Sequence, residues 1–179
     1  MSKAFDSIGW NFLLEVMEAL GFSQKWRDWI ASLLGTASSK ILVNGQPTQG
    51  IRHARGLRQA DLLSTLLFIL AIDPLQRIIE TAAQREILKL IVPKAANLRC
   101  SLYADDAAIF ADPLALELDR LHKILNFFGE CSGLKINISK TEIFPIRLDN
   151  NAASHLLSSP SAWTTTRSVT CFAISQEDM

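Results

Sequence analysis

The sequence predicts an α/β fold of the α+β type, in which a small antiparallel sheet is flanked by helices. Three observations lead to this prediction. Several stretches repeat apolar residues at helical spacing, and short strand-like runs lie between them. In addition, 49% of the 179 residues are hydrophobic, which is enough for one sizeable core. We therefore expect one folded unit, with or without a tail.

The first predicted elements are two helices. Residues 10–20 carry apolar side chains at helical spacing, Asp6 or Ser7 can cap this helix, and Gly21 ends it. A second helix is expected over residues 23–35. We expect the tryptophans of this second helix in the hydrophobic core, with a platform for stacking bases as the less favoured alternative.

A hairpin and a long helix follow. Residues 40–51 are predicted as a hairpin, because Asn44-Gly45 favours a type I′ turn. Residues 52–58 contain the densest basic cluster of the chain. A long apolar helix is expected over residues 63–83, with a kink or break at Asp73-Pro74 because proline interrupts helical hydrogen bonding.

Two adjacent carboxylates, Asp105 and Asp106, stand inside an apolar run at residues 100–110. Carboxylates rarely enter such a run unless they are paired or bind a metal. At the turn of a β-hairpin they can hold a divalent metal for phosphoryl-transfer chemistry. An ordinary solvated Asp-Asp turn is the alternative, and the motif alone does not decide between the two.

The C-terminal part divides into a structured stretch and a tail. A helix is expected over residues 113–131, followed by strands at 135–138 and 142–146. After about Asp149 the composition shifts to Ser, Thr and Ala without any period. We therefore expect residues 148–179 to form a divergent, disordered tail.

Composition limits the function classes. The 18 Lys and Arg cancel the 18 Asp and Glu, so the chain lacks the basic balance typical of nucleic-acid binding, although a locally basic groove stays open. Cys100, Cys131 and Cys171 form no CxxC pattern, which indicates free thiols and no zinc site. No apolar run reaches membrane-spanning length. We expect an intracellular protein without a membrane partner, and the sequence leaves nucleus or cytoplasm open.

Four segments occur in an order that resembles a known family. They are Ser2–Ile8, Arg55–Ser64, Tyr103–Asp106 and Gly133–Glu142. Together they resemble the palm of reverse transcriptases from non-LTR (LINE-type) retrotransposons, of the kind abundant in plant genomes. The resemblance extends from about residue 2 to about residue 147. A lone Tyr-Ala-Asp-Asp is a weak signal, whereas four ordered motifs at fitting intervals are specific.

The resemblance implies an RNA-directed DNA polymerase. In that family, a primer hydroxyl attacks an α-phosphate in line, assisted by two Mg²⁺ ions. By resemblance, Asp105 and Asp106 are the metal ligands, and hard carboxylate oxygens suit Mg²⁺. The implied partners are an RNA template, a DNA primer and dNTP, whereas the sequence does not indicate an oligomeric state.

The same motifs imply further site residues. Phe5 matches the aromatic that lies under the nucleotide sugar, with a core phenylalanine as the alternative. Gln59 matches the residue that contacts the incoming nucleotide and the template, and Arg58 lies where it can meet phosphate. Without the resemblance, both would be polar residues at a helix start. Lys140 matches a lysine that acts on pyrophosphate, with a solvated surface lysine as the alternative. Tyr103 is expected to bind substrate through its place in the third motif.

The sequence departs from the family pattern at several positions. The first family motif begins with a metal-binding aspartate three residues before the position of Lys3, which falls ahead of Met1, and Asp6 cannot replace it. Glycine in the second family motif lets the backbone approach the nucleotide closely, and an added Cβ obstructs this. That glycine and two family prolines are replaced here by Ala60, Leu62 and Thr65.

We therefore expect a truncated or degenerate copy of the domain. Residues 1–147 would form a partial palm, with the fingers and thumb largely missing, and the family's polymerase activity is expected to be lost. One alternative is a non-catalytic remnant that binds nucleic acid or protein near Arg52, Arg55 and Arg58. The other is a remnant without function.

Overall fold

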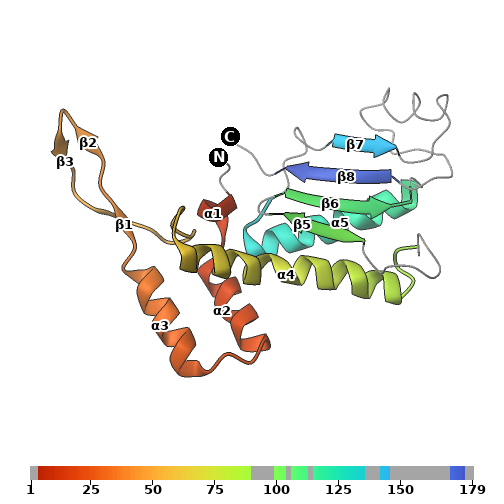
Figure 1. Ribbon diagram of the computed structural model, residues 1–179, viewed down its shortest axis with the longest axis horizontal. Helices are drawn as coiled ribbons and strands as arrows, with labels where there is room; N and C mark the ends of the chain where they lie inside the picture. Colours follow the sequence, from red (N-terminus) through yellow and green to blue (C-terminus); the bar gives the residue numbers. More distant parts are fainter. Residues whose placement is uncertain are drawn as a thin grey trace.

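The computed structural model describes residues 4–89, 99–103, 106–112, 115–135, 142–145 and 170–175. Its helices pack beside one main sheet, and a slender arm projects from the other end of the molecule (Figure 1). The helices are α1 (Ala4–Ser7), α2 (Trp10–Ala19), α3 (Gln24–Gly35), α4 (Leu62–Gln84) and α5 (Ala115–Ser132).

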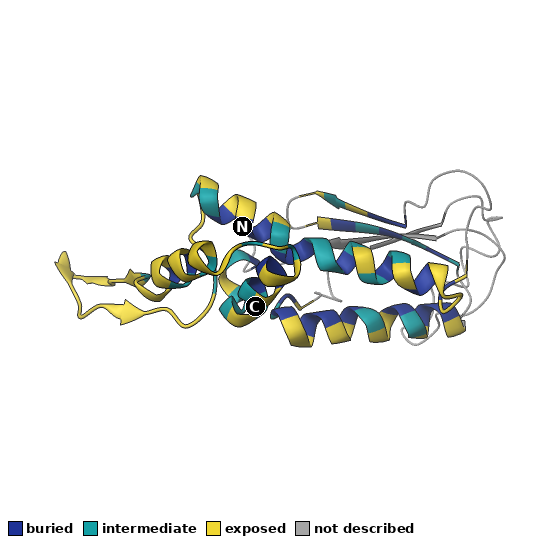
Figure 2. Cartoon of the chain, turned by 90° about the horizontal axis from the view of Figure 1, so that it is seen from below, coloured by how far each residue is buried: buried dark blue, intermediate teal, exposed yellow. Residues whose placement is uncertain are grey.

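The main sheet is antiparallel, and its strand order is β5–β6–β8–β7. The long helices α4 and α5 run side by side along it (Figures 1 and 2), and α4 contacts β5. The predicted α+β architecture, a small antiparallel sheet flanked by helices, is therefore confirmed. The strands are β5 (Cys100–Tyr103), β6 (Asp106–Ala111), β7 (Glu142–Pro145) and β8 (Thr170–Ser175).

Helix α4 forms the centre of the hydrophobic core. Its buried residues recur at helical spacing: Ser64, Leu67, Phe68, Ala71, Ile72, Leu75, Ile79, Ala82 and Ala83. The helix continues through Pro74, so of the kink or break expected there the break is wrong and the kink stays a prediction. Burial on both sides of the proline outweighs one lost hydrogen bond. The expectation that no apolar run reaches membrane-spanning length is wrong by length and composition. Within the described part of the chain, α4 is long and apolar enough to cross a membrane, a property that buried core helices share.

The start of α2 differs from the prediction. Asp6 and Ser7 lie in the short helix α1, and the extended residue Gly9 precedes α2 without any side-chain cap. The Gly9 N–H donates a hydrogen bond to the backbone carbonyl of Ser132, at 2.9 Å. The helix breaks here because the chain crosses the end of α5, and local sequence does not reveal such a tertiary contact.

Helix α3 follows Ser23 as predicted, and the Ser23 hydroxyl accepts a hydrogen bond from the Trp26 N–H. The expectation of buried tryptophans is wrong, because Trp26 is 40% and Trp29 is 55% exposed. Their rings meet edge to face, with centroids 5.8 Å apart. The smaller side chains of Ile30 and Leu34 supply the buried positions of this helix.

Residues 37–55 form the projecting arm of Figure 1. Within it, β1 pairs with β4 and β2 pairs with β3, both antiparallel. Asn44 and Gly45 have φ angles of 50° and 77°, and a type I′ turn requires positive values at both positions. The predicted hairpin is confirmed. Its strands are β1 (Ser38–Ser39), β2 (Leu42–Val43), β3 (Gln46–Pro47) and β4 (Ile51–Arg52).

Strand β8 corrects the prediction for the tail. We expected disorder throughout residues 148–179, yet residues 170–175 pair with both β6 and β7 inside the sheet. Thr, Cys, Phe and Ile in this stretch favour a strand, and the pairing satisfies a backbone edge of β6 that would otherwise stay open. Residues 146–169 lie outside the described part, and the domain boundary at residue 147 stays a prediction.

Candidate functional site

The third motif lies at one end of the β5–β6 ladder. Tyr103 closes β5, Asp106 opens β6, and the two residues are partners in the register. Both are exposed, Tyr103 to 83%. Residues 104 and 105 connect them, so Asp105, the first predicted metal ligand, lies outside the described residues. Asp106 thus begins a strand, as predicted for a carboxylate on a hairpin.

The ladder behind Asp106 is anchored in the core. Along β6 the burial alternates, with Ala107, Ile109 and Ala111 buried and Asp106 exposed. On β5, Cys100 is buried opposite Ile109. Because side chains alternate between the two faces of a strand, this register holds Asp106 away from the apolar face.

The carboxylate of Asp106 offers hard oxygen atoms of the kind that Mg²⁺ prefers. Among the described residues, no group of three His, Cys, Asp or Glu side chains converges as a metal site. Asp105 is the neighbour that would complete a pair. The donor chemistry of the pair therefore fits a divalent cation with further ligands from water or substrate.

The first and second motifs are tied together, although they are far apart in sequence. The Leu57 N–H donates to the Phe5 carbonyl at 2.6 Å, and the Gly56 N–H donates to the Ile8 carbonyl at 2.8 Å. The indole Nε1 of Trp10 donates to the Gly56 carbonyl at 2.7 Å. Gly56 has a φ of 85°, and a Cβ there would lie 2.6 Å from the Asp6 carbonyl oxygen. The two segments therefore meet so closely that only glycine fits.

Phe5 itself is half-buried. Its ring stacks on that of Phe68 in α4, with centroids 4.5 Å apart and an angle of 12° between the planes. This contact is what a core phenylalanine would make. The role of Phe5 beneath a nucleotide sugar stays a prediction.

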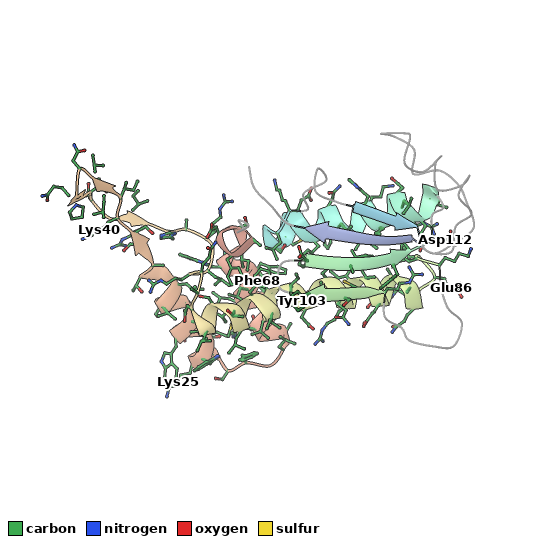
Figure 3. All side chains as sticks on the ribbon, turned by 45° about the horizontal axis from the view of Figure 1, so that its top comes forward. Lys25, Lys40, Phe68, Glu86, Tyr103 and Asp112 are labelled. Carbon is green, nitrogen blue, oxygen red and sulfur yellow. The ribbon has the colours of Figure 1, made fainter. Side chains whose placement is uncertain are left out.

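Arg58 and Gln59 line a cavity of about 470 Å³ between α1 and the root of the arm. Asp6, Arg55 and His53 are also among its lining residues. Tyr103, Asp106 and Phe5 are not among those lining residues. In Figure 3, Tyr103 marks the end of β5 that points toward α1 and the part of α4 that carries Phe68. A single groove shared by the hairpin and Gln59 stays a prediction.

Sequence reasoning missed the hydroxyls that line this cavity. Ser38 and Ser39 of β1 contribute to it, and Ser39 Oγ lies 2.8 Å from His53 Nε2. The signal available in the sequence was His53 within the basic cluster, but its pairing with β1 depends on the hairpin register. Lys140, the remaining predicted site residue, lies outside the described residues.

Ala60 has a φ of 64°, in the left-handed region that favours glycine. It lies between Gln59 and Asp61, and the Asp61 side chain caps α4 by accepting the Leu63 N–H. Alanine in place of the family glycine therefore adds a Cβ, as expected, and also has to adopt an unfavourable backbone conformation. An L side chain in this conformation costs on the order of 1 kcal/mol.

We expect Ala60→Gly to raise the free energy of unfolding by about 1 kcal/mol, because glycine adopts positive φ without steric cost. Urea titration followed by circular dichroism measures the change. Ala31→Gly, inside α3, is the matched control and should lower stability by about 1 kcal/mol. The explanation fails if both substitutions destabilise the protein equally.

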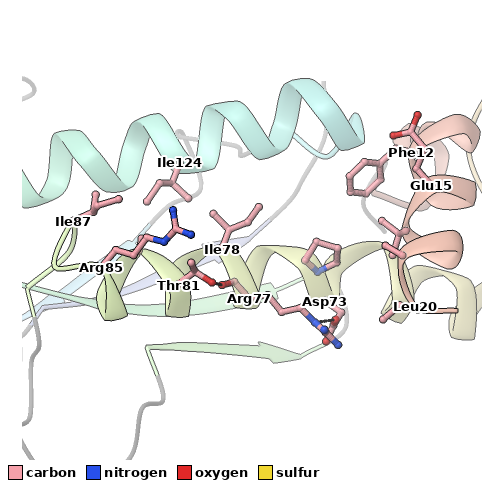
Figure 4. A pocket seen from close by; sticks show the side chains of 14 residues that line it. Phe12, Glu15, Leu20, Asp73, Arg77, Ile78, Thr81, Arg85, Ile87 and Ile124 are labelled. Carbon is pink, nitrogen blue, oxygen red and sulfur yellow. Dashed lines mark hydrogen bonds and ion pairs between the residues drawn. The ribbon is translucent and has the colours of Figure 1, made fainter.

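A second and larger cavity of about 610 Å³ lies between α2, α4 and α5 (Figure 4). Its lining is mainly apolar and includes Val16, Ile78 and Ile124, with the Asp73–Arg77 ion pair at the side. None of the predicted site residues lines it. Size alone therefore does not mark the functional site of this protein.

Cys100 is unreactive in this fold. Burial raises the pKa of its thiol to about 12, and the negative charge of Glu80 acts in the same direction. Since the thiolate is the nucleophile and metal ligand, the thiol stays protonated at neutral pH. Cys100 and Cys131 are both free, as predicted.

A family model described as reverse transcriptase (RNA-dependent DNA polymerase) matches residues 1–168. The chain belongs to this family. It is 28% identical over 141 residues to the transposon TX1 uncharacterized 149 kDa protein of Xenopus laevis, covering 78% of this chain and 10% of that protein. It is 29% identical over 141 residues to the Pol polyprotein from the type-2 retrotransposable element R2DM of Drosophila melanogaster, covering 78% of this chain and 13% of the polyprotein.

A third relative is the Pol polyprotein from the type-1 retrotransposable element R2 of Popillia japonica, 30% identical over 110 residues, or 62% of this chain and 18% of the polyprotein. The chain thus spans less than a fifth of the length of these relatives. The predicted family is confirmed: this is a reverse transcriptase domain of the non-LTR, LINE type. A plant-like origin stays a prediction. Reverse transcriptases as a family use divalent metal ions and act on an RNA template and a DNA primer.

Proposed function

We propose that this chain supplies the carboxylate-bearing palm of an RNA-directed DNA polymerase, in which Asp105 and Asp106 hold Mg²⁺. The observation that carries the proposal is the position of Asp106. It opens β6 opposite Tyr103, exposed at the end of a ladder that is anchored in the core through Cys100, Ala107 and Ile109. A rigid strand end is a suitable support for a metal ligand, because ligand geometry must be held closely.

The proposed chemistry draws on residues of the second, third and fourth motifs. When bound, divalent cations supply charge stabilisation at the attacking and leaving oxygens of nucleotidyl transfer. Arg58, exposed beside Gln59, offers a guanidinium to phosphate oxygens of template or nucleotide. Tyr103 presents an exposed aromatic ring beside Asp106. We assign Lys140 to the pyrophosphate end of the reaction by resemblance.

The chain on its own is proposed to be inactive in DNA synthesis. In this sequence the resemblance assigns only two carboxylates to the metal ions, Asp105 and Asp106, and a missing metal ligand weakens the charge stabilisation on which this chemistry depends. Ala60 adds to this, because it strains the turn that presents Gln59. DNA synthesis would therefore require residues beyond this pair of aspartates.

Metal binding tests the proposal directly. Mn²⁺, a paramagnetic probe for the magnesium site, is titrated into the full 179-residue chain, and the free ion is measured by electron paramagnetic resonance. We expect Asp105→Asn/Asp106→Asn to weaken binding at least tenfold, because it removes both anionic ligands. Asp119→Asn/Glu130→Asn on the surface of α5 is the charge-matched control and should bind as the wild type does. Equal binding by all three proteins would refute the metal site.

Primer extension on an RNA template tests the expected inactivity. With Mg²⁺ and dNTP, extension by the wild-type chain should equal that by Asp106→Asn. Robust extension by the wild type that Asp106→Asn abolishes would show instead that this chain is a complete polymerase.

A further inference from the structure

The projecting arm has an uneven charge for a chain that is neutral overall. Residues 29–60 contain no aspartate or glutamate, whereas the whole chain has 18 acidic and 18 basic residues. The same stretch carries Lys40, Arg52, Arg55 and Arg58. The arm is therefore a purely cationic element, and a polyanion is the partner that complements it.

The basic side chains of the arm are exposed to solvent. Every residue from 38 to 55 is exposed (Figure 2), and Figure 3 shows Lys40 far out on the arm. Among the described residues, the ion pairs involve neither Lys40 nor Arg52 nor Arg55. Their positive charges are thus not neutralised inside the described part of the chain.

The arm has no core of its own. Its ladders are each two residues long on either strand, and a lone two-stranded hairpin is at best marginally stable in water. Ile41, Leu42 and Val43 near its tip are 56%, 69% and 54% exposed. Exposed apolar residues on such an arm indicate a surface that a partner covers.

The root of the arm is nevertheless fixed in direction. The Ala37 N–H donates to the Leu34 carbonyl of α3, and the His53 N–H donates to the Ala37 carbonyl, both at 3.0 Å. The contact of Ser39 with His53 joins the two strands. These hydrogen bonds therefore fix the direction in which the two-stranded arm projects from the helices.

We propose that the arm is a second nucleic-acid contact, which binds B-form duplex DNA by laying its ribbon in the major groove. That groove is about 12 Å wide and admits a two-stranded ribbon, whereas the major groove of A-form RNA is too narrow and deep. Lys40 directly follows β1 and Arg52 lies on its partner β4, so each side of the ribbon can reach a phosphate backbone. The apolar tip would meet base edges, including thymine methyl groups.

This contact is separate from the aspartate pair and does not depend on it. A protein partner would use the exposed apolar tip, but it would not require a stretch free of acidic residues. A phosphate backbone accounts for both the charge and the exposure. The salt dependence of binding distinguishes the two partners.

The test measures binding of the full chain to a fluorescently labelled DNA duplex of about 20 base pairs and to an RNA duplex of equal sequence. Anisotropy titrations at several salt concentrations give affinity and salt slope. We expect Lys40→Ala/Arg52→Ala/Arg55→Ala to weaken DNA binding at least tenfold. The slope of log K against log salt should fall by up to about 3, since each lost phosphate contact removes about 0.9.

Arg77→Ala/Arg85→Ala/Lys123→Ala is the control with the same change in net charge; these exposed residues lie on α4, directly after α4 and on α5. It should retain most of the affinity and slope. Leu42→Ser should weaken DNA binding without changing the slope, because it removes an apolar contact only. Circular dichroism checks that each variant is folded.

The proposal is overturned if the arm and control variants lose affinity equally, or if RNA duplex binds as tightly as DNA duplex. The proposal is also overturned if the arm variant binds duplex DNA as tightly as the wild type does. The exposed apolar tip would then be assigned to a protein partner. The Mn²⁺ titration is independent of this measurement. Loss of the metal site and loss of the arm's DNA binding are therefore separate results.

Discussion

Glu117→Ala is expected to lower the free energy of unfolding by about 3–5 kcal/mol, because it would leave a buried guanidinium without its counter-charge. Glu117 Oε1 lies 3.0 Å from Arg99 Nη1, and the two side chains are 4% and 7% exposed. Glu117 Oε2 accepts the Lys89 N–H at 2.8 Å. A single carboxylate thus joins α5, the start of β5 and the segment after α4.

The matched control is Asp119→Ala on the same helix. Asp119 pairs with Lys123 at 2.7 Å, but this pair is exposed, and surface pairs contribute at most about 1 kcal/mol. Urea unfolding of both variants at neutral pH measures the difference. The interpretation is wrong if the two losses are the same. Arg99→Met/Glu117→Leu should recover much of the loss, since it removes both charges and keeps the volume.

The elements that the sequence predicted well depend on local patterns. Helices α4 and α5 repeat apolar residues at helical spacing, and the Asn44-Gly45 turn has its own conformational preference. The β5–β6 ladder follows from two apolar runs around adjacent aspartates. In each case the residues that determine the element lie within the element.

The elements that escaped prediction depend on contacts between distant segments. The break at Gly9 arises where α1 crosses the end of α5, and the exposure of Trp29 depends on which face of α3 the core covers. Strand β8 pairs across a wide gap in sequence with β6 and β7. The hydrophobic periodicity within a segment does not indicate such pairings between distant segments.

The candidate site shows the same division. The apolar runs on either side of the two aspartates predicted that Asp106 would lie at a hairpin, and the hairpin is confirmed. The contact of α1 with the segment around Gly56, by contrast, depends on a backbone approach that only the fold reveals. The positive φ of Ala60 is likewise a property of the folded turn.

The crossing of α1 with α5 has the second large expected effect. Gly133 has a φ of 82°, and an added Cβ would overlap the backbone carbonyl oxygen of Ser7. The Gly9 N–H to Ser132 carbonyl bond is part of the same crossing. Backbone atoms cannot rotate away as side chains do, so the crossing must open. We therefore expect Gly133→Ala to lower the free energy of unfolding by more than about 2 kcal/mol.

Gly35→Ala is the control for this substitution, because Gly35 lies in α3 with open space around it and no positive φ. It should raise stability by about 0.5–1 kcal/mol, since alanine favours the helix. Opposite signs in urea unfolding would show that the crossing is a tight anchor for α1. The anchor holds Phe5 on Phe68 and Asp6 beside Gly56, so its loss should also loosen the cavity that contains Arg58 and Gln59. Stabilisation by both substitutions would show that α1 is free to shift at this crossing.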